Sequence, residues 1–307
     1  MKPHIEVVEV GPRDGLQNEA RVLDVDTRVD LIHRLVADGV RRLEAVSFVR
    51  TDLVPQMSDA EEVLSQLDLR SDVTYIGLVL NRRGAERAAQ AQNCSEINVV
   101  VPVTNGFSTR NQRCTVAEMV THAACCVAVA RDAGMTASVT LAVAFGCPFD
   151  GPVGDVAVAR VLDQVADLGV DEIAFANTIG VGVPDQVTAL ADLVRDDPRV
   201  PRVRFHFHNT RNTGYANAYA ASRLDGFNEI ALDSSVGGFG GCPFAPAATG
   251  NIATEDLGYL LRGGGNTHTG IALDGITRTG TWLAERLGRP APGLLVRAGD
   301  FPNGDAA

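Results

Sequence analysis

The sequence lacks features that would assign the protein to a nucleic-acid-binding or membrane class. No segment concentrates Lys and Arg, and the formal net charge of −11 would repel a phosphate backbone. No stretch approaches the roughly 20 apolar residues of a membrane span, and residues 1–4 lead into strand-like sequence rather than an apolar signal core. We therefore expect a cytoplasmic protein with neither nucleic acid nor a membrane as its partner.

Cysteine is sparse and never occurs as a CxxC pair. Six cysteines spread through 307 residues are more typical of reduced thiols than of a disulfide framework or a structural zinc site. They are Cys94, Cys114, Cys125, Cys126, Cys147 and Cys242. Most are expected to be small core residues, and Cys242 differs because it lies in a glycine-rich loop.

The chain also lacks a GxGxxG turn after any apolar run, which argues against a dinucleotide-binding open sheet. Instead, short runs rich in Val and Ile alternate with longer stretches of helical periodicity. Eight strands are predicted, over residues 5–10, 42–48, 73–80, 96–103, 137–145, 172–176, 203–208 and 229–233. Their spacing is that of βα units, so the sequence predicts an α/β fold, a (β/α)₈ barrel of the TIM type.

Helix signals agree with this alternation. A helix is predicted from Asp26 through Leu35, residues 115–118 form a capping box, and Pro184 stands just inside a helix start. After about residue 266 one further helix is predicted through residue 287, which gives a barrel domain over 1–287 with a short C-terminal extension. The tail over 288–307 is expected to be loosely ordered.

A pair of histidines stands near the end of the seventh predicted strand. His206 and His208 are two residues apart, so both side chains point to the same face, with their bases roughly 6 to 7 Å apart, while Phe205 and Phe207 point outward. This spacing allows one metal to be shared. Taken alone, two core or surface histidines would look the same.

Asp14, at the end of the first strand, can complete a histidine and carboxylate set. The carboxyl ends of barrel strands build the active site, and only strand eight separates strands seven and one in a closed ring. Arg13 beside a metal would stabilise an enolate oxygen. The alternative makes Asp14 a turn cap and Arg13 a solvated cation.

Cys242 lies among four glycines, where a sharp turn can bring a thiol over the barrel mouth. A lone cysteine is more often chemically inert. The residues by themselves leave both readings open.

Several longer segments, taken together and in order, resemble the 3-hydroxy-3-methylglutaryl-CoA lyase family. They are GPRDGLQNE at 11–19, EAVSFV at 44–49, VPQM at 54–57, TIGVG at 178–182, GGCPF at 240–244 and TGNIATED at 249–256. The resemblance covers about residues 4 to 270.

The resemblance implies a divalent metal, Mg²⁺ or Mn²⁺, and an acyl-CoA substrate cleaved by retro-Claisen chemistry into acetyl-CoA and acetoacetate. It also implies roles for individual residues. The metal ligands are Asp14, His206, His208 and Asn251, the catalytic residues are Arg13, Glu44 and Cys242, and the substrate-binding residues are Gln17, Ser47, Asn81, Asn177 and Thr178. The dimers of the family make a homodimer the expected assembly.

Two positions depart from the pattern of the family. Asn177 and Asn209 stand where the lyases usually carry Asp, and an amide cannot act as a base as a carboxylate can. A related 3-hydroxyacyl-CoA is therefore a second possible substrate. The sequence is also compatible with a condensing enzyme like the isopropylmalate and homocitrate synthases, and with a barrel that binds metal and acyl-CoA without turnover.

Overall fold

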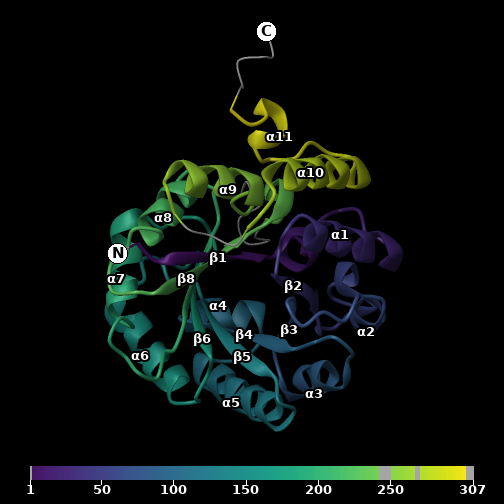
Figure 1. Cartoon of the computed structure of the whole chain (residues 1–307). Helices are drawn as coiled ribbons and strands as arrows, with labels where there is room; N and C mark the ends of the chain where they lie inside the picture. The colour runs from purple at the N-terminus through teal and green to yellow at the C-terminus, as the bar shows by residue number, and fades with distance from the viewer. Residues whose placement is uncertain (1, 242–249, 267–269, 302–307) are drawn as a thin grey trace.

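The computed structural model describes residues 2–241, 250–266 and 270–301. Eight parallel strands close into a barrel in the order β1 to β8, with helices around the outside (Figure 1). The strands are β1 His4–Glu9, β2 Arg42–Ser47, β3 Thr74–Val79, β4 Glu96–Pro102, β5 Thr136–Ala142, β6 Glu172–Asn177, β7 Val203–Phe207 and β8 Glu229–Ser234. The predicted (β/α)₈ architecture is confirmed.

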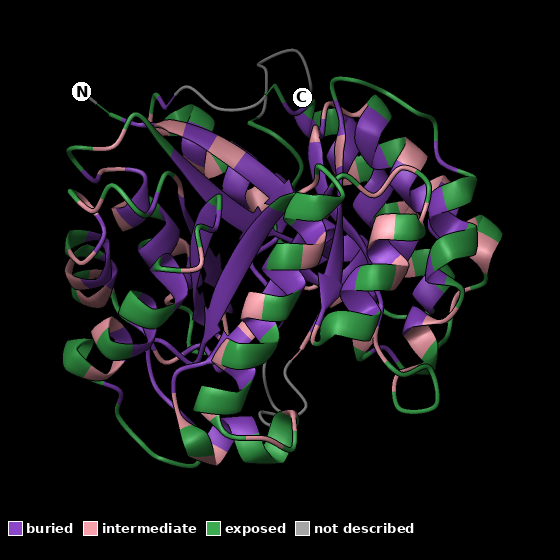
Figure 2. Ribbon diagram, turned by 90° about the horizontal axis from the view of Figure 1, so that it is seen from below, coloured by how far each residue is buried: buried purple, intermediate pink, exposed green. Residues whose placement is uncertain are grey.

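The helices form the outer layer. They are α1 Val25–Ala37, α2 Ala60–Ser65, α3 Arg82–Gln90, α4 Asn105–Asn111, α5 Val116–Asp132, α6 Asp155–Ala166, α7 Pro184–Asp192, α8 Gly214–Ala221, α9 Thr254–Gly263, α10 Leu273–Leu287 and α11 Leu295–Ala298, with short turns η1 Gly11–Gly15, η2 Pro55–Met57 and η3 Val236–Gly238. Figure 2 shows buried strands surrounded by helices whose outer faces are exposed. Among the described helices none alone is long and apolar enough to cross a membrane, although the bent pair α4 and α5 passes by length and composition.

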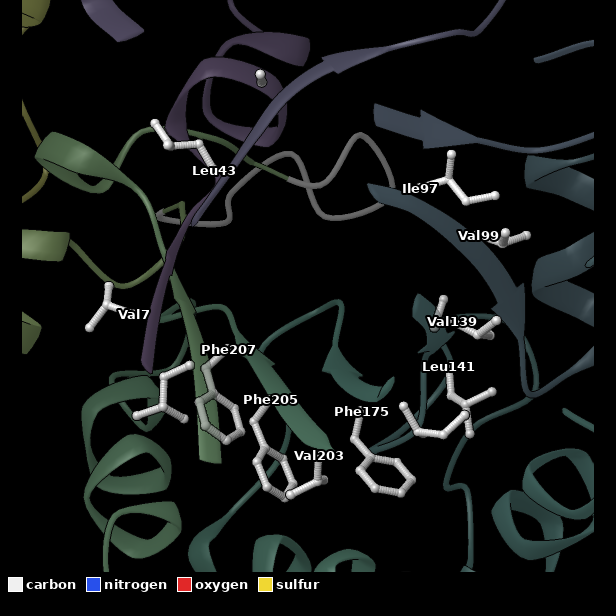
Figure 3. Packing of buried hydrophobic residues seen from close by; sticks show 14 of the residues in the cluster. Val7, Leu43, Ile97, Val99, Val139, Leu141, Phe175, Val203, Phe205 and Phe207 are labelled. Atoms are coloured by element: carbon white, nitrogen blue, oxygen red, sulfur yellow. The ribbon is translucent and has the colours of Figure 1, made fainter. Parts of the chain in front are cut away.

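Alternation along each strand separates the helix-facing core from the barrel interior. Phe175, Phe205 and Phe207 lie between the strands and the surrounding helices, and the rings of Phe205 and Phe207 stack with centroids 5.7 Å apart (Figure 3). His206, between these two phenylalanines, points into the barrel and lines its cavity. The outward orientation predicted for Phe205 and Phe207 therefore holds.

Some helix and strand boundaries in the structure differ from the predicted ones. Helix α1 starts at Val25 because Asp24, rather than Asp26, caps it by accepting a hydrogen bond from the Thr27 amide. Strand β5 ends three residues before the predicted limit, and Val143, which follows it, adopts a left-handed φ of 57° that extended backbone excludes. Helix α10 ends at the predicted residue but begins at Leu273.

The described part of the C-terminal tail is bound to the barrel. The Leu294 and Leu295 amides donate to Asp256 at 2.9 and 2.7 Å, and the Gly293 amide donates to the Gly237 carbonyl at 2.9 Å. The tail over 288–307 was expected to be loosely ordered, whereas these residues of it are hydrogen-bonded to the barrel. Residues 302–307 lie outside the described residues. The contacts hold the turn after β8 against α9.

Near the start of the strands the barrel interior holds buried ion pairs, beside a small apolar cluster of Val8, Val10, Ile76 and Ala231. Arg42 contacts Glu96 at 2.5 Å and Glu172 at 2.7 Å, and Arg204 contacts Glu172 at 3.0 Å and Asp233 at 3.6 Å. All five side chains are at least nine-tenths buried. Burial raises the pKa of Glu172, but the neighbouring Arg42 and Arg204 outweigh it and lower the pKa to about 2.

Arg42→Met should therefore destabilise the fold by roughly 3 to 5 kcal/mol, because it removes the ion-pair partner of the buried Glu96 carboxylate and one of the two cations beside Glu172. Urea unfolding measures the loss. Arg82→Met is the matched control: Arg82 forms an exposed pair with Glu86, and its loss should cost about 1 kcal/mol or less. Equal losses in the two variants would show that the interior pairs contribute no more than surface ones.

Candidate metal centre and active-site cavity

Three side chains converge at the open end of the barrel. The Asp14 Oδ2 atom lies 4.0 Å from His206 Nε2 and 3.9 Å from His208 Nε2, and one ligand atom from each residue lies within 4.8 Å of the others. Asp14 belongs to the short helical segment η1, which has Pro12 in its first turn and follows β1. His206 belongs to β7, and His208 follows its last residue.

Asn251 reaches the same place through a short backbone bridge. Residues 208 and 251 pair in antiparallel fashion, and the Ile252 amide donates to the Phe207 carbonyl at 3.2 Å. The Asn251 Nδ2 group donates to Asp14 Oδ2 at 2.8 Å, and its buried Oδ1 atom has no hydrogen-bond partner among the described residues. A buried carbonyl oxygen in this position is suited to a cation.

The protonation states of Asp14 and His208 favour a metal ligand set. Burial and the neighbouring His206 lower the pKa of His208 to about 4, so its imidazole is neutral near pH 7. Burial acts to raise the pKa of Asp14, but Arg13 and the two histidines lower it further than burial raises it. Burial lowers the pKa of His206, but Asp233 and Asp14 raise it by more, so metal binding at this imidazole would compete with a proton. The cluster thus offers a carboxylate, imidazole nitrogens and an amide oxygen, which fit a divalent metal ion.

His206 is oriented from behind by Asp233. The distance from His206 Nδ1 to Asp233 Oδ2 is 3.0 Å, and both side chains are at least nine-tenths buried. A proton on Nδ1 would satisfy Asp233 and leave the Nε2 lone pair facing Asp14. Carboxylates that hold a ligating histidine in this way fix its tautomer and strengthen metal binding.

Asp233→Asn should therefore weaken Mn²⁺ binding by roughly 10 to 100-fold, measured by titration calorimetry on metal-free protein. Asp52→Asn is the control because Asp52 also lines the cavity but is exposed and pairs with Arg50. Unchanged affinity in Asp233→Asn, or an equal loss in Asp52→Asn, would contradict the orienting role.

Arg13 is fixed beside this cluster. Its Nε atom donates to Glu44 Oε2 at 2.6 Å and its Nη1 atom to Asp14 Oδ1 at 2.7 Å. Asn98 donates to the second Glu44 oxygen at 2.8 Å. Burial lowers the pKa of Arg13, but Glu44 and Asp14 raise it by more, so the guanidinium is charged. Glu44 thus lies behind Arg13 and positions it.

A cavity of about 1430 Å³ opens from the metal cluster toward the loops after β2, β3 and β4. Arg13, Asp14, His206, His208 and Asp233 line its inner end. The volume exceeds the roughly 300 to 1,000 Å³ of most small-molecule pockets, so a long ligand can be held.

The predicted substrate residues fall into two groups. Gln17, Asn81 and Thr178 line the cavity. Ser47 is buried, and its register beside Leu78 points it into the barrel. Cys242 lies outside the described residues.

Comparison with known proteins gives a consistent result. A family model described as HMGL-like matches residues 4–282. The chain belongs to this HMGL-like family. It is 42% identical to the (R)-citramalyl-CoA lyase of Chloroflexus aurantiacus, over 96% of this chain and 95% of that protein, and 40% identical to the hydroxymethylglutaryl-CoA lyase of Pseudomonas mevalonii, over 96% and 97%.

A solved structure agrees with these relatives. The HMG-CoA lyase from Acinetobacter baumannii, in complex with coenzyme A and 3-methylmalate, superposes with a TM-score of 0.89 at 35% identity, covering 98% of this chain and 97% of that one. The HMGL-like chain is accordingly an enzyme of the carbon–carbon lyase class.

The two asparagines that depart from the HMGL-like pattern accept hydrogen bonds from backbone amides. Asn177 Oδ1 accepts hydrogen bonds from the Val181 and Gly182 amides at 2.9 and 3.0 Å, and Asn209 Oδ1 accepts one from the Gly214 amide at 3.0 Å. Within the described part of the chain, neither residue is in the cavity wall. An amide oxygen performs this task as a carboxylate would.

Asn177→Asp should therefore leave kcat/KM and substrate preference within about twofold, because the acceptor oxygen is kept. Asn177→Ala should destabilise the protein by about 1 to 3 kcal/mol, since the buried Gly182 amide and the partly buried Val181 amide lose their acceptor. Activity assays with thermal unfolding separate the two effects. A large activity gain in Asn177→Asp would show that the missing charge acts on the substrate.

Two features of the site were not foreseen from the sequence. Asp233 looked like the polar end of a strand, and Asn98 like an ordinary strand residue. Both are inward positions of their strands, at the same parity as the residues facing the barrel. Counting inward positions on every strand would have found them.

Proposed function

We propose that the protein cleaves the bond between C2 and C3 of a 3-hydroxyacyl-CoA, with 3-hydroxy-3-methylglutaryl-CoA as the first candidate substrate. The observation that carries the proposal is the buried Arg13 guanidinium fixed beside the cluster of Asp14, His206, His208 and Asn251 at the inner end of a long cavity. The names of the relatives support an acyl-CoA substrate.

The chemistry needs a place for the electron pair of the broken bond. Transfer of the 3-hydroxyl proton to a base turns C3 into a ketone carbon, and the C2–C3 electrons move into the thioester as an enolate. Arg13, which is held by Glu44 and Asp14, would donate to that enolate oxygen. Protonation at C2 then gives acetyl-CoA, and acetoacetate is the second product.

The ligand set would hold Mg²⁺ or Mn²⁺, which when bound supplies a Lewis acid and a template for the substrate hydroxyl and carboxylate. Asp14 and the two histidines would hold that ion, with Asn251 Oδ1 as a fourth donor. Cys242 as the proton donor to C2, a homodimeric assembly and a cytoplasmic location stay predictions.

A second substrate is favoured by one specific observation. The (R)-citramalyl-CoA lyase is similar to this chain over nearly the full length of both proteins. Citramalyl-CoA also carries a hydroxyl on C3, so the same bond could be broken, with pyruvate in place of acetoacetate. The acyl group differs only on the far side of C3 from the thioester.

The test is release of acetyl-CoA from a panel that includes both thioesters and longer 3-hydroxyacyl analogues. We expect cleavage with Mg²⁺ or Mn²⁺, loss on chelation and recovery on readdition. Arg13→Met should lower kcat by roughly 100 to 1,000-fold, since it removes a donor to the developing charge. Cleavage of no panel member with either metal would exclude the proposal.

The same assays separate a lyase from a synthase and from an inactive barrel. Condensation of acetyl-CoA with 2-oxo acids, without cleavage, would indicate a synthase. Binding of metal and acyl-CoA by calorimetry without either reaction would indicate a barrel that has lost turnover.

A further inference from the structure

The outer part of the cavity is strongly basic. Four arginines, Arg50, Arg83, Arg87 and Arg113, line it beyond the metal cluster, and we call them the basic rim. Asp52 is the single carboxylate among the described residues that line this outer part. The chain as a whole carries a formal net charge of −11, so this local excess of positive charge runs against the protein's overall field.

Two of the four arginines are already neutralised. Arg50 pairs with Asp52, with Nε to Oδ1 at 3.0 Å. Arg87 forms two hydrogen bonds to Glu61 at 2.7 and 2.9 Å and lies over the ring of Phe48. The charges of Arg50 and Arg87 are therefore balanced within the protein, and these two residues form part of the cavity wall.

Arg83 and Arg113 have no hydrogen bond or ion pair through their guanidinium groups within the described ranges, and both residues are exposed. Neighbouring exposed arginines do pair: Arg82 contacts Glu86 at 2.8 Å, and Arg110 donates to the Gly106 carbonyl at 3.0 Å. Two unpaired cations in a cavity wall of an acidic protein are available for an anionic ligand.

The fold brings the two residues to one side of the mouth. Arg83 is in the first turn of α3, which follows β3, and Arg113 stands between α4 and α5, which follow β4. Strands β3 and β4 are neighbours, and α3 packs against α5 (Figure 1). Asn81 caps α3 through the Gly84 amide at 3.0 Å, and Gln112 donates to the Val100 carbonyl at 3.0 Å, which anchors the backbone beside each arginine.

We propose that Arg83 and Arg113 bind the phosphate groups of the CoA part of the substrate. The inference rests on the proposed function, which gives the substrate a thioester at the metal cluster and a polyanion at its other end. A carboxylate of the acyl group would lie beside the reacting carbon, where Arg13 and the metal ligands already stand. The phosphates are the anions left for the outer part of the cavity.

The test compares Arg83→Gln and Arg113→Gln with two substrates carrying the same acyl group, the CoA thioester and the pantetheine thioester, which lacks the nucleotide phosphates. Each variant should raise KM for the CoA thioester by roughly tenfold with kcat little changed, as expected for loss of one charge-assisted contact. KM for the pantetheine thioester should stay within about twofold. The dephospho-CoA thioester shows which arginine contacts the 3′-phosphate.

Arg82→Gln and Arg110→Gln are the matched controls, because these exposed arginines are sequence neighbours whose side chains do not line the cavity within the described residues. An equal KM increase in the controls would indicate a general effect of surface charge and overturn the assignment. So would an unchanged KM for the CoA thioester, or an equal increase for the pantetheine thioester, which would place the arginines on the acyl group.

Calorimetric titration with free CoA tests the phosphate site independently of the proposed cleavage reaction. If the wild-type protein cleaves no thioester, the proposed function fails, while tenfold weaker CoA binding in Arg83→Gln and Arg113→Gln would still support the phosphate site. If cleavage occurs but CoA affinity is the same in wild type and variants, the phosphate site fails alone.

Discussion

A continuous chain of buried ion pairs inside the barrel connects its floor to the metal cluster. Arg42 holds Glu172, Glu172 holds Arg204, and Arg204 contacts Asp233, which orients His206. Burying such charges is costly unless each has a partner, so these side chains are mutually dependent. The position of His206 therefore depends on residues from four different strands, β2, β6, β7 and β8. A change in the packing of the barrel interior would also change the metal cluster.

The strands and the two inward histidines could be predicted because they follow from simple alternation. Phe205 and Phe207 had to face the helices, so His206 and His208 had to face the interior. The interior ion pairs could not be predicted in the same way. Arg42, Glu96 and Glu172 stand at the starts of their strands, where a charged residue is equally typical of a solvated strand end.

The role of Asn251 could not be predicted from the local sequence pattern. Its position depends on the antiparallel bridge between residues 208 and 251, a contact across 43 positions that no periodicity encodes. Only the family resemblance pointed to it. For Asn177 the family resemblance was the weaker guide. It identified a change of residue type, but the geometry shows that this side chain holds a backbone turn. A difference from a family pattern gains meaning only when the direction of the side chain is known.

Strand β2 contains an irregularity with a wide effect on the cavity. Ala45 is an extra residue, because Glu44 pairs with Ile76 while Val46 pairs with Gly77. The insertion reverses the alternation, so both Glu44 and Ser47 face inward, and Phe48 packs outside against α3 instead of filling the barrel. One additional residue thus divides the strand into two registers. The lower register carries Glu44, which anchors Arg13, and the upper register leads into residues 48–56, which line the outer cavity.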